Sequence, residues 1–178
     1  MVRLPKSIIG LVIVSYLSSA DAQAPRTFGA WQVGVMSGDE GVYAATMNDS
    51  GGVFGEYCYK STGQCLWLLT NDIKCNEGTQ VPILANTDGG AFSSTVKCIS
   101  PNNGISRYII DYKIIEPGIE GSLWIGIAYP MKNGQFQVSR FNLSGASQAK
   151  TYMEEFPSIS EMVPRLVPRI RATGGFRL

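Results

Sequence analysis

Nine short apolar or aromatic runs, separated by turn residues, constrain the fold of this chain more than any other feature. Clusters rich in Gly, Asn, Asp and Ser lie between the runs, as in "SGDEG" and "NDSGG". Strands spaced about a dozen residues apart, with turn chemistry between them, are typical of an antiparallel β-sandwich or barrel. The expected strands cover 28–36, 41–47, 53–59, 64–70, 79–86, 91–100, 106–115, 122–130 and 134–143. Pro82 restricts its strand to an edge or a bulge.

A helix is expected only late in the chain, over residues 144–156. Ser144 is suited to the N-cap position, and Ala149, Met153 and Phe156 follow it at helical spacing. Two prolines in the following "MVPRLVPRIR" prevent a continuous helix. The predicted fold class is therefore all-β, an antiparallel sandwich or barrel-like domain with one short C-terminal helix.

The start of the chain has the pattern of an export signal. A basic "MVRLPK" precedes the apolar "SIIGLVIVSYL" and the small residues of "SSADA", which predicts a signal peptide over 1–22. The apolar run is shorter than the ~20 residues that a spanning helix needs. The expected organisation is this signal, one β domain over 23–156 and a basic, proline-containing tail over 157–178. The expected location is periplasmic or secreted, with no membrane-spanning segment.

Charge and histidine content exclude several function classes. Without the signal, 13 basic and 13 acidic residues remain, so there is no general attraction to nucleic acid. The tail is locally basic, and its four arginines are candidates for binding an acidic partner: Arg165, Arg169, Arg171 and Arg177. The chain contains no histidine, which excludes Ser-His-Asp and Cys-His catalysis and every zinc site that needs an imidazole.

The four cysteines are expected to form disulfides, since an exported chain with an even number of cysteines meets an oxidising compartment. Three pairings are possible. Cys58 and Cys65 flank the turn-like "KSTG" and would face each other across a hairpin, which leaves Cys75 to pair with Cys98. The spacings suit neither a catalytic C-x-x-C dithiol nor a four-cysteine zinc site. No cofactor or metal is expected.

Carboxylates and aromatic residues are the remaining candidates for a site. The adjacent acids Asp39-Glu40 and Glu154-Glu155 diverge in direction and indicate solvated surface rather than two facing catalytic carboxyls. Asp111 lies in an apolar run and is expected to point outward, near Lys113 or Arg107. The three tryptophans, Trp31, Trp67 and Trp124, could floor a sugar or peptide groove, but their apolar surroundings favour core packing. No catalytic residue is predicted.

Two short motifs carry a family resemblance. "FGAWQV" follows closely after the expected signal, and "VSRFNLSGASQA" closes the β-rich region. In this order they resemble the invasion-associated locus B family, exported bacterial envelope proteins that are linked with host-cell entry in some pathogens. The resemblance implies a β-rich, disulfide-containing exported domain and transfers no catalytic residues.

Two functions are compatible with these features. The first is an exported, non-catalytic protein that binds a protein or a cell-envelope component, with a role in host interaction implied by the resemblance. The alternative is a histidine-free, carboxylate-based hydrolase of envelope glycans. Two carboxyl groups about 5–9 Å apart in an open groove would favour the hydrolase.

Overall fold

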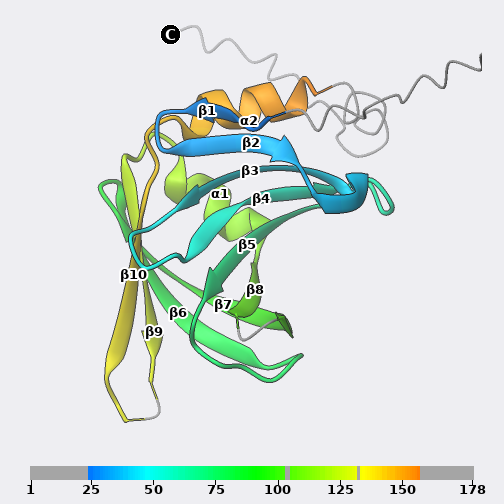
Figure 1. The fold of residues 1–178 in the computed structure, drawn as a ribbon. Coiled ribbons are helices and arrows are strands. Elements are labelled where there is room, and N and C mark those ends of the chain that lie inside the picture. Colours follow the sequence, from blue (N-terminus) through cyan, green and yellow to red (C-terminus); the bar gives the residue numbers. More distant parts are fainter. Residues whose placement is uncertain (1–23, 103–104, 132, 157–178) are drawn as a thin grey trace, which may run out of the picture.

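A computed structural model describes residues 24–102, 105–131 and 133–156. Ten antiparallel strands form one sheet, in the order β1-β2-β3-β4-β5-β8-β7-β6-β9-β10 (Figure 1). The strands are β1 (Arg26–Phe28), β2 (Trp31–Val35), β3 (Gly41–Met47), β4 (Val53–Tyr59), β5 (Cys65–Asn71), β6 (Gln80–Thr87), β7 (Gly90–Asn102), β8 (Ile105–Ile110), β9 (Trp124–Pro130) and β10 (Phe136–Asn142). The helices are the 3₁₀ turn η1 (Ser37–Asp39), α1 (Tyr112–Ile119) and α2 (Ala146–Glu154). The all-β prediction with a C-terminal helix is confirmed.

The sheet curls without closing, because its edge strands β1 and β10 do not pair with each other. Residues at and just after the end of β10 nevertheless form hydrogen bonds with residues at and just before the start of β2. The Trp31 indole Nε1 donates to the Asn142 carbonyl at 3.0 Å, and the Ala30 amide donates to the Ser144 carbonyl at 3.0 Å. These bonds join the first and last parts of the sheet and give the molecule a half-barrel shape (Figure 1).

One hydrophobic core fills the inner side of the curled sheet. Its centre is aromatic: Trp31, Phe54 and Trp67 are fully buried, with the Phe54 and Trp67 ring centroids 4.9 Å apart. Helix α2 lies along β1, β2 and β3 (Figure 1) and buries Ala149 and Met153. Helix α1 carries the chain from β8 to β9 across the inner side, because β7 and β6 separate those two strands. The prediction that tryptophans pack in the core is thus confirmed for Trp31 and Trp67.

The expected strand over 106–115 is wrong in its second half. Strand β8 ends at Ile110, and α1 follows with Asp111 as its N-cap. The Asp111 carboxylate accepts from the Lys113 backbone amide at 2.9 Å, which stabilises the first turn of the helix. Ile115 and Ile119, one helical turn apart, then face the core. Asp111 is therefore a capping residue rather than an outward strand residue.

Pro82 lies within β6, in a part of the strand that pairs with β7 alone. Pairing between β6 and β9 begins only at Leu84, so Pro82 has no strand on its second side. A residue without an N–H is accommodated there without loss of a sheet hydrogen bond on that side.

Both expected disulfides are present. Cys58 and Cys65 are direct register partners in the β4–β5 hairpin, and Cys75 pairs with Cys98. The bonds link residues 7 and 23 positions apart, so the second constrains the longer segment. Two disulfides indicate an oxidising environment. In the described part of the chain, no helix combines the length and apolar character needed to span a membrane.

Candidate functional site

Strands β3 and β4 present two very different faces, because successive side chains of a strand point to opposite sides of the sheet. Glu56 points to the inner side and is 4% exposed. Its neighbour Tyr57 points to the outer side and lines a hollow there. Each face therefore carries one candidate for function, an inner carboxylate cluster and an outer groove.

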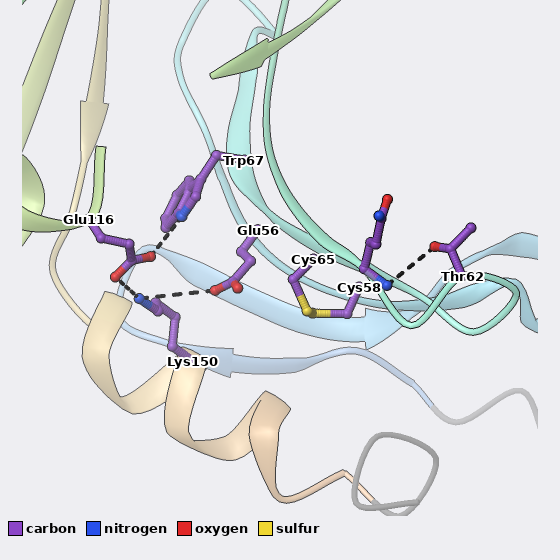
Figure 2. The surroundings of a disulfide bond; sticks show 8 residues. Glu56, Cys58, Thr62, Cys65, Trp67, Glu116 and Lys150 are labelled. Carbon is purple, nitrogen blue, oxygen red and sulfur yellow. Dashed lines mark hydrogen bonds and ion pairs between the residues drawn. A yellow bond between two sulfur atoms is a disulfide. The ribbon is translucent and has the colours of Figure 1, made fainter. Parts of the chain in front are cut away.

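The inner cluster joins a strand to both helices (Figure 2). The Lys150 ammonium of α2 lies 2.5 Å from Glu116 Oε2 of α1 and 4.0 Å from Glu56 Oε2 of β4. The second Glu116 oxygen, Oε1, accepts from the Trp67 indole Nε1 at 2.7 Å. Lys150 also lies over the Trp67 ring, with Nζ 5.5 Å from its centroid. One lysine thus connects two carboxylates and an indole.

Burial raises the pKa of Glu56 from 4.5 to about 7. The Lys150 charge opposes this shift, whereas the neighbouring Glu116 and Glu154 add to it, and a hydrogen bond with Tyr112 lowers the pKa slightly. Burial and the nearby carboxylates in turn hold the pKa of the Tyr112 phenol well above its usual range. Glu56 therefore changes its protonation near neutral pH.

This arrangement differs from a pair of glycosidase carboxyls. A lysine ammonium contacts both Glu56 and Glu116, so it occupies space that a scissile bond or a water would need. Glu56 is also covered, and neither Glu56 nor Glu116 lines either of the two hollows described below. The geometry suits a clamp that holds α1 and α2 to the sheet.

Glu56, Cys58 and Cys65 also place their oxygen and sulfur atoms within 4.8 Å of one another. Such a set would suit a soft metal if the sulfurs were thiolates. Both sulfurs are committed to the disulfide, so neither is available as a thiolate ligand in this state.

The outer face carries a groove of about 470 Å³ that crosses β2, β3 and β4. Three successive outward register pairs of β3 and β4 build it: Tyr43 with Tyr57, Ala45 with Gly55, and Met47 with Val53. The middle pair is small and the outer two are large, so Ala45 lines the floor between two walls, with its register partner Gly55 beside it. Gln32, the partner of Ala45 on β2, and Ala30 complete the lining.

Close packing of the strands sets the depth of the groove. A Cβ added to Gly55 would lie 2.4 Å from the Ala44 carbonyl oxygen and 2.5 Å from the Ala45 Cβ. Glycine is therefore required at this floor position. In the wall, the Tyr43 and Tyr57 rings stack with centroids 5.8 Å apart and planes 23° apart. Tyr43 lies against Gly34, whose missing side chain leaves room for the ring.

The groove is electrically neutral. Among the described residues that line it, none carries a formal charge: they are two tyrosines, a glutamine, a threonine, a methionine, a valine and two alanines. Burial, with help from Tyr43 and Tyr59, raises the pKa of Tyr57 to about 12, against a smaller opposing effect of Arg107. The Tyr57 hydroxyl is thus protonated at any physiological pH, able both to donate and to accept hydrogen bonds.

The described part of the chain carries a second hollow and an exposed apolar surface. A hollow of about 590 Å³ near the β4–β5 hairpin is lined by Asp39, Glu40, Tyr59, Lys60 and Ser61, and an exposed ion pair between Lys60 and Asp39 lies in it. On the outer face of β6 and β10, three apolar side chains are more than half exposed: Leu84 at 52%, Phe136 at 64% and Val138 at 56%.

Those residues predicted from sequence that the structure describes are absent from the groove lining. Trp124 is half-buried beneath Arg140, whose guanidinium carbon is 5.6 Å from the ring centroid. Glu154 and Glu155 are exposed at the end of α2. The tail arginines Arg165, Arg169, Arg171 and Arg177 lie outside the described residues, so their role stays a prediction.

The sequence did contain a signal for the groove. The outward positions of strand 41–47 follow the pattern Tyr-x-Ala-x-Met, from 43 to 47. Those of strand 53–59 follow the pattern Val-x-Gly-x-Tyr, from 53 to 57. In an antiparallel hairpin these two patterns superimpose as large, small, large, which predicts a groove across the strands. Glu56 was likewise detectable as an acid on the inward positions of its strand.

The chain matches no known family model, and neither a curated protein nor a solved structure matches it with significance.

Proposed function

We propose that this protein is an exported, non-catalytic binding protein, periplasmic or secreted, that holds a cell-envelope component in the groove across β2, β3 and β4. The groove carries the proposal, because its volume of about 470 Å³ lies within the ~300–1,000 Å³ of small-ligand sites. Its walls are aromatic and aliphatic, and tyrosine hydroxyls and an amide supply the polar contacts. The two disulfides support a location outside the reducing cytoplasm.

The clamped cluster on the inner face supports binding over catalysis. A hydrolase needs a carboxylic acid and a carboxylate that both reach the substrate. Here the lysine holds both carboxyls, and the strand and helices cover Glu56. The resemblance to the invasion-associated locus B family, and with it a role in host interaction, stays a prediction. The tail arginines remain proposed as a second contact with an acidic partner.

One observation favours the alternative, a carboxylate-based hydrolase of envelope glycans. Burial sets the pKa of Glu56 at about 7, a value suited to a general acid near neutral pH, and a second carboxyl lies beside the same lysine. If this alternative holds, the protein releases reducing ends from purified cell-wall glycan, and Glu56→Gln abolishes the release. Absence of release by the unaltered protein excludes it.

Binding is tested with the full, disulfide-bonded protein and a bacterial cell-envelope extract immobilised on a sensor surface. We expect saturable binding that weakens at least tenfold in Tyr57→Ala. Phe136→Ala is the matched control, since it removes an exposed outward aromatic residue from β10, outside the groove lining. Near-ultraviolet circular dichroism checks that both variants keep their tertiary packing.

Equal binding by the unaltered protein and Tyr57→Ala would contradict the groove as the binding site. Loss in Phe136→Ala alone would assign binding to the apolar surface of β6 and β10 instead.

A further inference from the structure

The chemistry and shape of the groove restrict the kind of molecule that it can hold. We propose that it binds the neutral pyranose rings of a glycan chain, packed against the Tyr43–Tyr57 wall. This inference rests on the proposed binding function and names the ligand class of the same site.

The absence of charge in the described groove lining favours a neutral ligand. The described lining carries no formal charge, and the hydroxyl of Tyr57 stays protonated because its pKa is about 12. An anionic or cationic ligand buried against such a lining would lose hydration without gaining an opposite charge. A neutral ligand has no such cost. Neutral sugars therefore suit the groove better than phosphorylated, sulfated or uronic-acid sugars.

The groove walls combine apolar and polar groups. A pyranose presents apolar C–H groups on its faces and hydroxyl groups around its edge. The two tyrosines offer apolar ring carbons with polar hydroxyl ends, and the Gln32 amide both donates and accepts hydrogen bonds. Met47 and Val53 supply an apolar second wall. The lining thus offers apolar contact and polar contact side by side, as a sugar ring does.

The direction and width of the groove suit a chain of single sugar rings. It runs across the strands, and Tyr43 and Met47 on its two walls are four residues apart in β3. At ~3.4 Å per residue their Cα atoms are about 14 Å apart, which leaves room for one ring between the side chains. Extension across several strands lets successive rings of a chain lie along the floor formed by Ala45 and Gly55.

The strand pairing at the groove favours a glycan ligand over a peptide ligand. An extended peptide usually binds a sheet by pairing with a free strand edge. Strand β3 is paired with β2 and β4, and β4 is paired with β3 and β5, so these strands offer no free edge at the groove. Recognition here relies on side chains alone. This suits a ligand whose own hydrogen-bonding groups are hydroxyls.

The test measures binding of the full, disulfide-bonded protein to a panel of defined oligosaccharides by calorimetry. The neutral arm holds N-acetylglucosamine oligomers, β-glucans and galactans, and the charged arm holds sulfated, sialylated and uronate oligosaccharides. We expect binding in the neutral arm, weakened at least tenfold by Tyr57→Ala and about threefold to tenfold by Gln32→Ala. Tyr57→Phe keeps the ring and is expected to retain affinity within about threefold. Phe136→Ala is the control and keeps full affinity.

If Tyr57→Ala folds poorly, the other two variants still test the proposal. Tyr57→Phe should then keep its affinity for the neutral glycan, and Gln32→Ala should lose affinity while it stays folded. Preferential binding of the charged arm would overturn the inference, and so would neutral binding that ignores both Tyr57→Ala and Gln32→Ala. If envelope binding depends on Tyr57 while no neutral glycan binds, the ligand class is wrong and the binding function stands. If neither envelope nor glycan binding depends on Tyr57, both proposals fail.

Discussion

The two faces of the β3–β4 hairpin can be compared at a single pair of neighbours, Glu56 and Tyr57. Glu56 points inward to a lysine, a second carboxylate and a tyrosine, all supplied by helices. Tyr57 points outward to a neutral groove whose walls come from adjacent strands. Adjacent residues thus serve opposite purposes, one holding the fold together and the other forming a surface for a ligand.

The difference follows from solvent access. A buried carboxylate needs charged and hydrogen-bonding partners, because water no longer solvates it. These partners must come from other elements, and here they tie α1 and α2 to β4. An outward side chain keeps its contact with water and needs no such partners. We therefore expect inner substitutions to change stability strongly and most outer substitutions to change binding instead.

The largest effect is expected from Lys150→Met, which keeps the apolar stem and removes the ammonium. Glu56 and Glu116 would then lie close together without the intervening positive charge, so the free energy of unfolding at pH 8 should fall by about 3–5 kcal/mol. Urea denaturation measures it. Lys60→Met is the matched control: it breaks an ion pair whose Asp39 partner is 70% exposed and should change stability by less than ~1 kcal/mol. Equal effects of the two substitutions would contradict the clamp.

Glu56→Gln is expected to stabilise the protein at pH 8. The folded-state pKa of about 7 exceeds the ordinary 4.5, so the folded state binds the proton more tightly than the unfolded state. The contribution of this group to stability is therefore most favourable below pH 4.5 and declines as the pH rises to about 7. At 1.36 kcal/mol per pKa unit, a shift from 4.5 to about 7 means that the variant should gain about 3 kcal/mol at pH 8.

Urea denaturation from pH 4 to pH 8 measures this difference. The unaltered protein should lose stability between about pH 4.5 and 7 relative to Glu56→Gln, and the gap should vanish at the acid end. Glu77→Gln, at an exposed position, controls for the general loss of one negative charge. A constant gap at every pH would show that Glu56 does not titrate in this range.

Gly55→Ala is expected to be an outer substitution that does lower stability. Its Cβ would lie 2.5 Å from the Ala45 Cβ, so the two strands must separate and the free energy of unfolding should fall by about 2 kcal/mol. Gly89→Ala is the control, since its Cβ would meet nothing nearer than 3.5 Å. Thermal or urea unfolding compares them. An unchanged free energy of unfolding in Gly55→Ala would mean that β3 and β4 are less tightly packed there than the 2.5 Å distance indicates.

Gln32→Ala should have the smallest effect on stability. The side chain is exposed on the outer face of β2, so its removal should change the free energy of unfolding by less than ~0.5 kcal/mol. The same substitution removes an amide from the groove lining and should weaken ligand binding. Denaturation and calorimetry on one preparation give both values. A large loss of stability without loss of binding would contradict the expectation that outer substitutions change binding rather than stability.

Much of the fold was predictable because its signals are local. Strand 41–47 and strand 53–59 were predicted with the bounds observed, since turn residues delimit them. The Cys58–Cys65 pairing followed from a hairpin register set by a short turn. Helix α1 was missed because "YKII" continues the apolar run of β8, and only the Asp111 cap and the burial of Ile115 distinguish it as a helix.

The candidate sites depended on contacts between distant segments. The outward large–small–large patterns of β3 and β4 are visible in the sequence, but they form a groove only in the observed register. Glu56 appears in the sequence as one acid in a strand. Its partners Glu116 and Lys150 belong to two separate helices, and no local pattern relates them to β4.

By itself, the sequence determined most of the strands, the preferred disulfide pairs and the presence of the C-terminal helix, because alternation and turn chemistry act over a few residues. The predicted Ser144 cap was wrong, since Gly145 is the N-cap of α2 and no side chain caps the helix there. Only the tertiary structure decided which face of β4 is buried under the helices and which stays open. That choice depends on how the helices dock on the curled sheet. It places Glu56 out of water beside Lys150, with a pKa of about 7, and leaves Tyr57 in a neutral groove on the surface.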